Sequence, residues 1–138
     1  NLQDLERLNR YFGGVRTVLA HLSRMAGQPS QRSLTILDIA TGGADIPRAI
    51  CRWARKRTLP VAIEAVDRGD QVLAAAAEWS IDFPEIRLRQ AQAPPLPYPD
   101  RSFEACLADW SAWSGSKRAR NPDAAFLGFA KKWSQGAS

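Results

Sequence analysis

The apolar positions of this chain alternate between helical spacing and short continuous runs. Steps of three and four residues predict helices, and they occur over about residues 2–25, from Asp45 to just before Pro60, and over 71–80. Short runs rich in strand formers predict strands, and they lie at residues 34–39, 61–67, 86–90 and 103–108. This alternation indicates βαβ units. With right-handed crossovers, we expect an α/β three-layer sandwich whose mainly parallel sheet has the strand order 3-2-1-4.

Two end segments flank the predicted core of residues 34–108. Residues 1–33 are expected to form an N-terminal helical cap, in which Gly13-Gly14 predicts a kink or two shorter helices. Residues 109–138 are expected to form a linker and a terminal helix that begins near Asn121. The outer edge of the fourth strand would then be unpaired. Because exposed edges recruit partners, self-association as a homodimer is expected there.

Composition narrows the class of protein. With 138 residues and 45% hydrophobic ones, the chain is typical of one globular domain. No apolar run reaches about 18 residues, so no membrane span is predicted. Cys51 and Cys106 lack a CxxC spacing and are expected to be buried thiols of a cytoplasmic protein. A single histidine, His21, argues against a zinc site or a catalytic triad, and no metal is expected.

The formal net charge of +5 raises the question of a nucleic-acid partner. Basic residues cluster at residues 48–57 and 117–120. The first cluster falls near the end of a predicted helix, where cations complement the helix dipole. No aromatic residues interleave with these cations in the manner of RNA-binding modules. A solvated helix face is therefore the expected interpretation, with a polyanion site as the alternative.

Three segments are predicted to meet at one edge of this Rossmann-like sheet. Ligands of such sheets bind beyond the carboxyl ends of the strands, at the switch point between the first and fourth. The turn 40–45 lies there, and its small residues let the backbone approach a ligand closely. Asp67 ends the second strand, where an acid suits the vicinal hydroxyls of a ribose. Gln92 and Ala93 follow the third strand at the same edge.

These segments resemble three motifs of the class I S-adenosylmethionine-dependent methyltransferases, in particular the quinone-biosynthesis-like, type 11 branch. Residues 37–47 look like motif I, in which an acid ends the first strand before a Gly/Ala-rich turn. Residues 65–68 are similar to the second motif, whose acid holds the cofactor ribose. Residues 90–104 resemble the family segment ADAxxLPFPDxSFD, the most specific of the three. Together the motifs cover about residues 34–108.

The resemblance implies S-adenosyl-L-methionine as cofactor and a small-molecule methyl acceptor as partner. Asp38 would organise the turn and, through water, the amino group of the methionine part. Asp67 would hold the ribose, and Arg68 would flank the adenine. The implied cofactor-binding residues are Asp38, Ala40, Thr41, Gly42, Gly43, Asp67, Arg68, Gln92 and Ala93. No catalytic residue is identified; Asp109, just past the fourth strand, is the one candidate on the acceptor side, with a solvated loop residue as the alternative.

The chain departs from the family pattern in three ways. Ala40 and Ala44 replace glycines that are usual in motif I. Gln92 replaces the usual Asp that accepts from the adenine amino group, so weaker binding is expected. Family members continue through three more strands, which this chain is expected to lack. Asp45 or Ala44 is well placed to cap the helix that follows. Asp45 is interpreted as a helix cap, with a cofactor contact as the alternative.

Methyl transfer to a small molecule, or a cofactor-binding fragment of an enzyme that does so, is the function that the motifs favour. A nicotinamide-dependent oxidoreductase is the first alternative, although its Gly-x-Gly-x-x-Gly spacing is missing after the first strand. An inactive fragment or scaffold that associates through the fourth strand is the second alternative.

Overall fold

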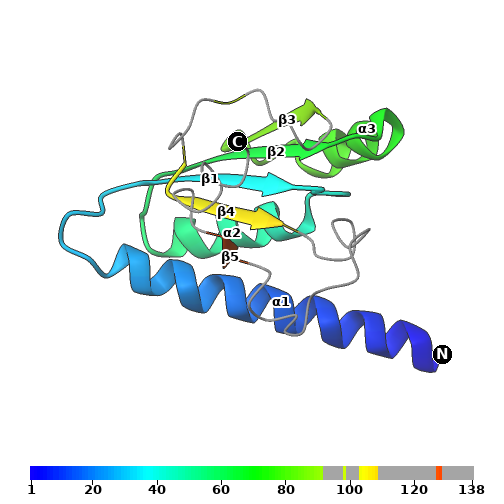
Figure 1. Ribbon diagram of the computed structural model, residues 1–138, viewed down its shortest axis with the longest axis horizontal. Coiled ribbons are helices and arrows are strands. Elements are labelled where there is room, and N and C mark those ends of the chain that lie inside the picture. Colours follow the sequence, from blue (N-terminus) through cyan, green and yellow to red (C-terminus); the bar gives the residue numbers. More distant parts are fainter. Residues whose placement is uncertain (92–97, 99–102, 109–126, 129–138) are drawn as a thin grey trace.

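The computed structural model describes residues 1–91, 98, 103–108 and 127–128 (Figure 1). Helices and strands alternate along the chain, as the apolar pattern predicts. The elements are α1 (Leu2–Ala26), β1 (Leu34–Ile39), α2 (Asp45–Lys56), β2 (Val61–Asp67), α3 (Asp70–Trp79), β3 (Ile86–Gln90), β4 (Ala105–Ala108) and β5 (Leu127–Gly128).

The five strands form one sheet in the order β3-β2-β1-β4-β5. β1 pairs in parallel with β2 on one side and with β4 on the other, and β3 pairs in parallel with β2. The predicted α/β fold and the order 3-2-1-4 are therefore confirmed. The central place of β1 explains its composition, because a strand buried on both faces needs an almost continuous apolar run.

The expectation of an unpaired edge on β4 is wrong for Cys106 and Leu107. These residues pair antiparallel with Gly128 and Leu127 of β5. Leu127 and Gly128 are also the described residues within the helix predicted from Asn121, and they form a strand there. The rest of the predicted linker and terminal helix lies outside the described residues. Backbone pairing at the sheet edge overrides the local helical pattern at these two positions.

The predicted break at Gly13-Gly14 does not occur, since α1 is continuous. A glycine in a helix interior costs only about 1 kcal/mol relative to alanine, which other interactions can offset. Asn1 and Asp4 form a capping box at the start of the helix. Val18 and Leu22, in its second half, are fully buried in the core. Capping at one end and packing at the other thus keep the helix intact through the glycines.

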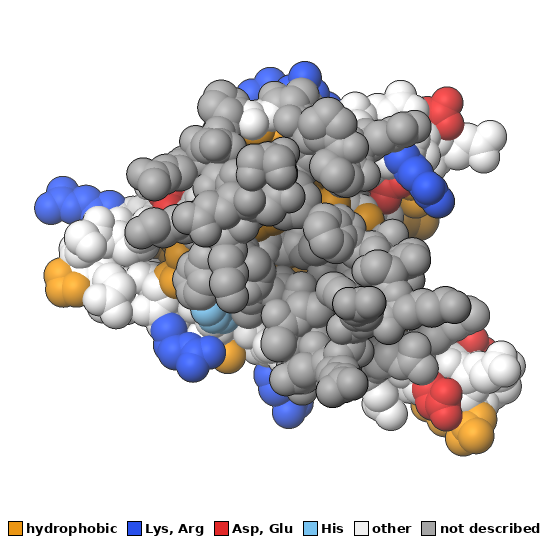
Figure 2. All heavy atoms as spheres, viewed as in Figure 1, with side chains coloured by type: hydrophobic (Ala, Val, Ile, Leu, Met, Phe, Trp, Pro, Cys, Tyr) orange, Lys and Arg blue, Asp and Glu red, His pale blue; other side chains and the backbone are white. Residues whose placement is uncertain are grey.

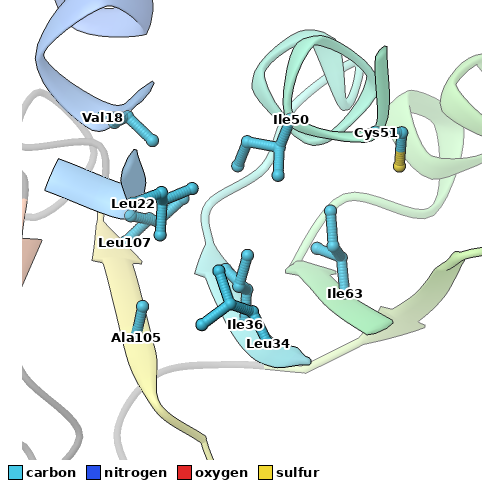
Figure 3. Close-up of a cluster of buried hydrophobic side chains, with 9 residues drawn as sticks. All are labelled: Val18, Leu22, Leu34, Ile36, Ile50, Cys51, Ile63, Ala105 and Leu107. Carbon is cyan, nitrogen blue, oxygen red and sulfur yellow. The ribbon is translucent and has the colours of Figure 1, made fainter. Parts of the chain in front are cut away.

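The main core lies between the sheet and the helices (Figure 3). Side chains of α1 and α2 point toward those of the central strands in this close-up. The cluster consists of Val18, Leu22, Leu34, Ile36, Ile50, Cys51, Ile63, Ala105 and Leu107. Right-handed crossovers from β1 to β2 and from β2 to β3 run in the same direction, which places α2 and α3 on one face. A hydrogen bond from Arg48 of α2 to Ser80, just after α3, agrees with this placement.

The opposite face of the sheet carries no helix among the described residues, so the described part has two layers where the sequence predicts three. Its buried side chains are Leu37, Ile39, Val66 and Cys106, which are at most 4% exposed. Tyr98 and Phe103, from the connection between β3 and β4, pack against this cluster. The hydroxyl of Tyr98 also donates to Glu64 of β2 at 2.9 Å. Tyr98 and Phe103 thus contribute to covering this face.

Cations near the end of α2 pack against aromatic rings. The Arg55 guanidinium donates twice to Glu85, each time at 2.8 Å, and holds the pKa of that carboxyl below its usual value. Arg52 and Arg55 both lie over the Phe83 ring. On the face shown in Figure 2, the described Lys and Arg side chains lie at separate places around the rim. The interpretation of the cluster 48–57 as a solvated helix face stays a prediction, with a polyanion site as its alternative.

No helix in the described ranges is long and apolar enough to cross a membrane.

The two cysteines generate a prediction about thiol reactivity. Both are free and buried, as expected, and burial raises the pKa of each thiol to about 12. At pH 8 only about one such thiol in 10⁴ would be ionised, and the thiolate is the form that reacts. We therefore expect neither Cys51 nor Cys106 to be alkylated by iodoacetamide in the folded protein within an hour, as measured by mass spectrometry. Both should react in 6 M guanidinium as the control, and rapid labelling of either native thiol would contradict the structure.

Candidate functional site

The parallel register of β1 and β2 brings two strand ends together. Ile39 lies opposite Val66, so the turn after β1 and Asp67 at the end of β2 emerge side by side. The Thr41 amide donates to the Val66 carbonyl at 2.9 Å, which extends the pairing by one bond beyond the strand. The turn that follows β1 is therefore held against the carboxyl end of β2.

Asp67 binds the turn directly. Its Oδ2 accepts a hydrogen bond from the Gly42 amide at 3.0 Å, and its Oδ1 accepts one from the Gly69 amide at 2.9 Å. The predicted proximity of Gly42 and Asp67 is confirmed. A carboxylate offers about four acceptor positions, so two bonds leave capacity for two further donors. Asp67 is only partly buried, which leaves it accessible to a ligand.

Asp38 lies just inside the same edge, near the end of β1. It is 5% exposed, and its Oδ2 accepts a hydrogen bond from the Thr41 hydroxyl at 2.6 Å. The Asp38 charge also raises the pKa of Cys106, after the larger effect of burial. Asp38 thus fixes the first residues of the turn through the Thr41 side chain.

The backbone of the turn alternates in handedness. Ala40, Gly42 and Ala44 have φ values of 57°, 58° and 61°, in the left-handed region that favours glycine. These are the positions at which motif I usually has glycine, and two of them carry alanine here. A left-handed conformation costs a residue other than glycine about 1 kcal/mol. The local contacts must therefore offset the strain at Ala40 and Ala44.

The turn has one open side and one packed side. A Cβ added at Gly42 would meet no atom of the described residues within 4 Å, whereas one added at Gly43 would come within 2.9 Å of the Trp79 ring. Trp79 ends α3 and lies over the turn from outside, although it is itself 59% exposed. Only the open side, at Gly42, leaves room for a ligand to approach the backbone.

Asp45 does not cap α2 as the sequence suggests. Ala44 holds the N-cap position without a side-chain cap, and Asp45 is the first helical residue. Its carboxylate forms an ion pair with Arg48 instead. Sequence analysis missed Arg48, although an acid and an arginine three residues apart at the start of a helix signal such a pair.

The remaining predicted residues fall in two groups. Arg68 is exposed, and its backbone carbonyl accepts a hydrogen bond from the side-chain Nε2 of Gln90 at 3.0 Å. The Ala91 amide donates to the Asp67 carbonyl at 3.0 Å, so the chain leaves β3 beside Asp67. Gln92, Ala93 and Asp109 lie outside the described residues. In the described part of the chain, no group of three or more His, Cys, Asp or Glu side chains could hold a metal ion.

Sequence relatives of the chain are methyltransferases. It is 36% identical over 72 residues to the ubiquinone/menaquinone biosynthesis C-methyltransferase UbiE of Rickettsia akari, a match covering 50% of this chain and 29% of that protein. The corresponding enzyme of Rickettsia bellii is 33% identical over the same length. The chain thus spans less than a third of the length of these relatives. No family model matches it.

Two solved structures with the same fold carry methyltransferase descriptions. A Methanococcus maripaludis protein assigned to the S-adenosyl-L-methionine-dependent methyltransferases matches with a TM-score of 0.59 at 13% identity, over 83% of this chain and 51% of its own. The CMeT domain of the citrinin polyketide synthase matches with a TM-score of 0.58 at 18% identity, over 68% of this chain and 26% of its own. At these identities the match concerns the fold alone. Sequence and fold together support the resemblance, and the chain is similar to the class I S-adenosylmethionine-dependent methyltransferases.

Proposed function

We propose that the chain carries the cofactor-binding part of an S-adenosylmethionine-dependent methyltransferase that acts on a small-molecule acceptor. One observation carries the proposal most directly. The open turn after β1 and the carboxylate that closes β2 share a hydrogen bond between the Gly42 amide and Asp67. A backbone that a ligand can approach thus lies beside an acceptor suited to ribose hydroxyls.

The residues at this edge fit an adenosine ligand. Asp67 would accept from the two ribose hydroxyls with the capacity that its bonds to Gly42 and Gly69 leave. Asp38 would keep the turn in place through Thr41 and act on the methionine amino group through water. Ala40, Thr41, Gly42 and Gly43 would present backbone to the cofactor. Arg68, Gln92 and Ala93 would surround the adenine, and Asp109 remains the candidate on the acceptor side.

Methyl transfer requires little acid–base catalysis from the protein. When bound, the cofactor would supply a methyl group on a sulfonium, to be transferred to an acceptor nucleophile as the neutral thioether leaves. The protein contributes mainly by holding the two reactants in line, and alignment alone can lower a barrier by several kcal/mol. A rigid turn with fixed hydrogen bonds suits this task, even though the described site shows no acid–base pair.

Other features of the whole protein belong to the same proposal. Residues 1–33, 34–108 and 109–138 would serve as helical cap, cofactor-binding core and linker with terminal segment. Buried free thiols support a cytoplasmic location. Self-association as a homodimer stays a prediction, although pairing of β4 with β5 weakens the reason for it.

Binding of the product analogue tests the proposal. We expect S-adenosylhomocysteine to bind this chain with a dissociation constant in the micromolar range, about −8 kcal/mol at 1 μM. Isothermal titration calorimetry at pH 7.5 measures it, and mass spectrometry of the purified protein should detect co-purifying cofactor. Absence of binding at millimolar ligand would remove the proposal for this chain.

Substitution of Asp67 tests the ribose contact. Asp67→Asn keeps the shape but removes the charge and turns an amide donor toward ligand or backbone donors. Loss of charge-assisted bonds should weaken S-adenosylhomocysteine binding about 10- to 100-fold. Glu78→Gln, an exposed acid on α3, is the matched control and should leave affinity unchanged. Equal affinities for the wild type and Asp67→Asn would contradict the assigned role.

Competition with a nicotinamide cofactor separates the two enzyme classes. The turn lacks the Gly-x-Gly-x-x-Gly spacing that receives a pyrophosphate, so NADH should not displace S-adenosylhomocysteine at tenfold excess. Displacement at comparable concentrations, followed by calorimetry or NADH fluorescence, would favour the oxidoreductase instead.

A further inference from the structure

Arg48 is a charged side chain in an unusual place. It lies in the first turns of α2 and is only 9% exposed. A cation near a helix N-terminus opposes the helix dipole, and burial of a charge is costly unless it is paired. Neither helix propensity nor solvation therefore explains its position, and its contacts must do so.

The guanidinium joins three segments of the chain. Its Nη1 donates to the Gly43 carbonyl at 2.6 Å and to the Ser80 hydroxyl at 3.3 Å, and its Nη2 donates to Asp45. Its Cζ also lies 5.8 Å from the centre of the Trp79 ring. Asp45 supplies the opposite charge, and Ser80 and Trp79 connect the group to the end of α3.

The bond to Gly43 acts on the strained part of the turn. Gly43 lies between Gly42 and Ala44, which both have left-handed backbones. Fixing the Gly43 carbonyl fixes the plane of the peptide that joins Gly43 to Ala44. The contact therefore restricts the rotation by which Ala44 could relax toward an ordinary φ. On the other side of the turn, the Gly42 amide binds Asp67.

Arg48 thus holds the packed side of the turn, while Asp67 binds near its open side. We propose that Arg48 is a positioning residue that keeps the turn 40–44 in the conformation that receives the cofactor. The inference rests on the proposed function for its ligand, but its effect on the turn does not require a ligand. Lysine would not replace it, because a single ammonium lacks the planar fork that reaches Gly43, Ser80 and Asp45 together.

Two readouts test this role in the full chain. Arg48→Met keeps the length of the side chain but removes its donors, so the turn should open more often. Hydrogen exchange measured by NMR should then be about tenfold faster at the Thr41 and Gly42 amides, the effect expected for loss of a charge-assisted bond. Core amides such as Ile36 should exchange as in the wild type. Affinity for S-adenosylhomocysteine should fall in proportion to the competent fraction of the turn, and therefore by less than the tenfold change in exchange.

Matched variants separate positioning from general stability. Arg52→Met changes an arginine one turn later on α2 that contacts the Phe83 ring, and it should leave both readouts unchanged. Arg48→Met combined with Ala44→Gly should recover exchange protection and affinity, because glycine adopts the left-handed conformation without strain. The melting temperature should not recover in the double variant, since glycine also makes the unfolded chain more flexible.

The outcomes are distinct. Unchanged protection at Thr41 and Gly42 in Arg48→Met would overturn the positioning role, as would a loss that Ala44→Gly does not reverse. If Arg48→Met fails to fold, Arg48→Lys takes its place, and the same amides should then show a smaller increase in exchange. A wild type that does not bind S-adenosylhomocysteine would refute the proposed function, while the exchange measurements would still decide the role of Arg48.

Discussion

The parallel pairing of β1 with β2 is the constraint on which the rest of this structure depends. Six residue pairs run from Leu34 opposite Val61 to Ile39 opposite Val66, and they set where both strands end. Because the ends coincide, the turn after β1 meets the carboxylate after β2 within hydrogen-bond distance. A slip of one residue would turn the side chains of β1 to the opposite face and separate these groups. The register of β1 against β2 therefore fixes both the packing of the core and the geometry of the site.

The strands and their order were predictable from the sequence because β1, β2 and β4 are short, largely apolar runs and β3 alternates apolar and polar residues. The five longest described strands and helices of the core begin and end within a few residues of their predicted limits. Where the observed elements differ from the predicted ones, tertiary contacts are the cause. Capping at Asn1 and burial of Val18 keep α1 continuous through Gly13-Gly14, and pairing with β4 makes a strand of Leu127 and Gly128.

The location of the site was predictable from the sequence, but its network of hydrogen bonds was not. The parallel sheet brings the carboxyl ends of β1 and β2 together, and with them Asp38, Gly42 and Asp67. The order of strands and helices along the sequence was enough to predict this arrangement. The contacts of Arg48 with Gly43 and Ser80 depend on how α2 and α3 pack, since Ser80 is 32 residues away in the chain. No local pattern carries that information. Asp45 was misinterpreted for a different reason, because its partner Arg48 lies only three residues away and the local spacing does signal the ion pair.

The left-handed positions at Ala40, Gly42 and Ala44 also limit how the turn can change during evolution. Valine, isoleucine and threonine are strongly disfavoured at such φ values, while glycine, alanine and asparagine can be accommodated. Only a few amino acids are thus accessible at three alternate positions, whatever ligand the turn serves. The two positions between them are restricted as well, because the Thr41 hydroxyl binds Asp38 and a side chain at Gly43 would meet the Trp79 ring. Diversification of this protein must therefore proceed mainly through residues around the turn.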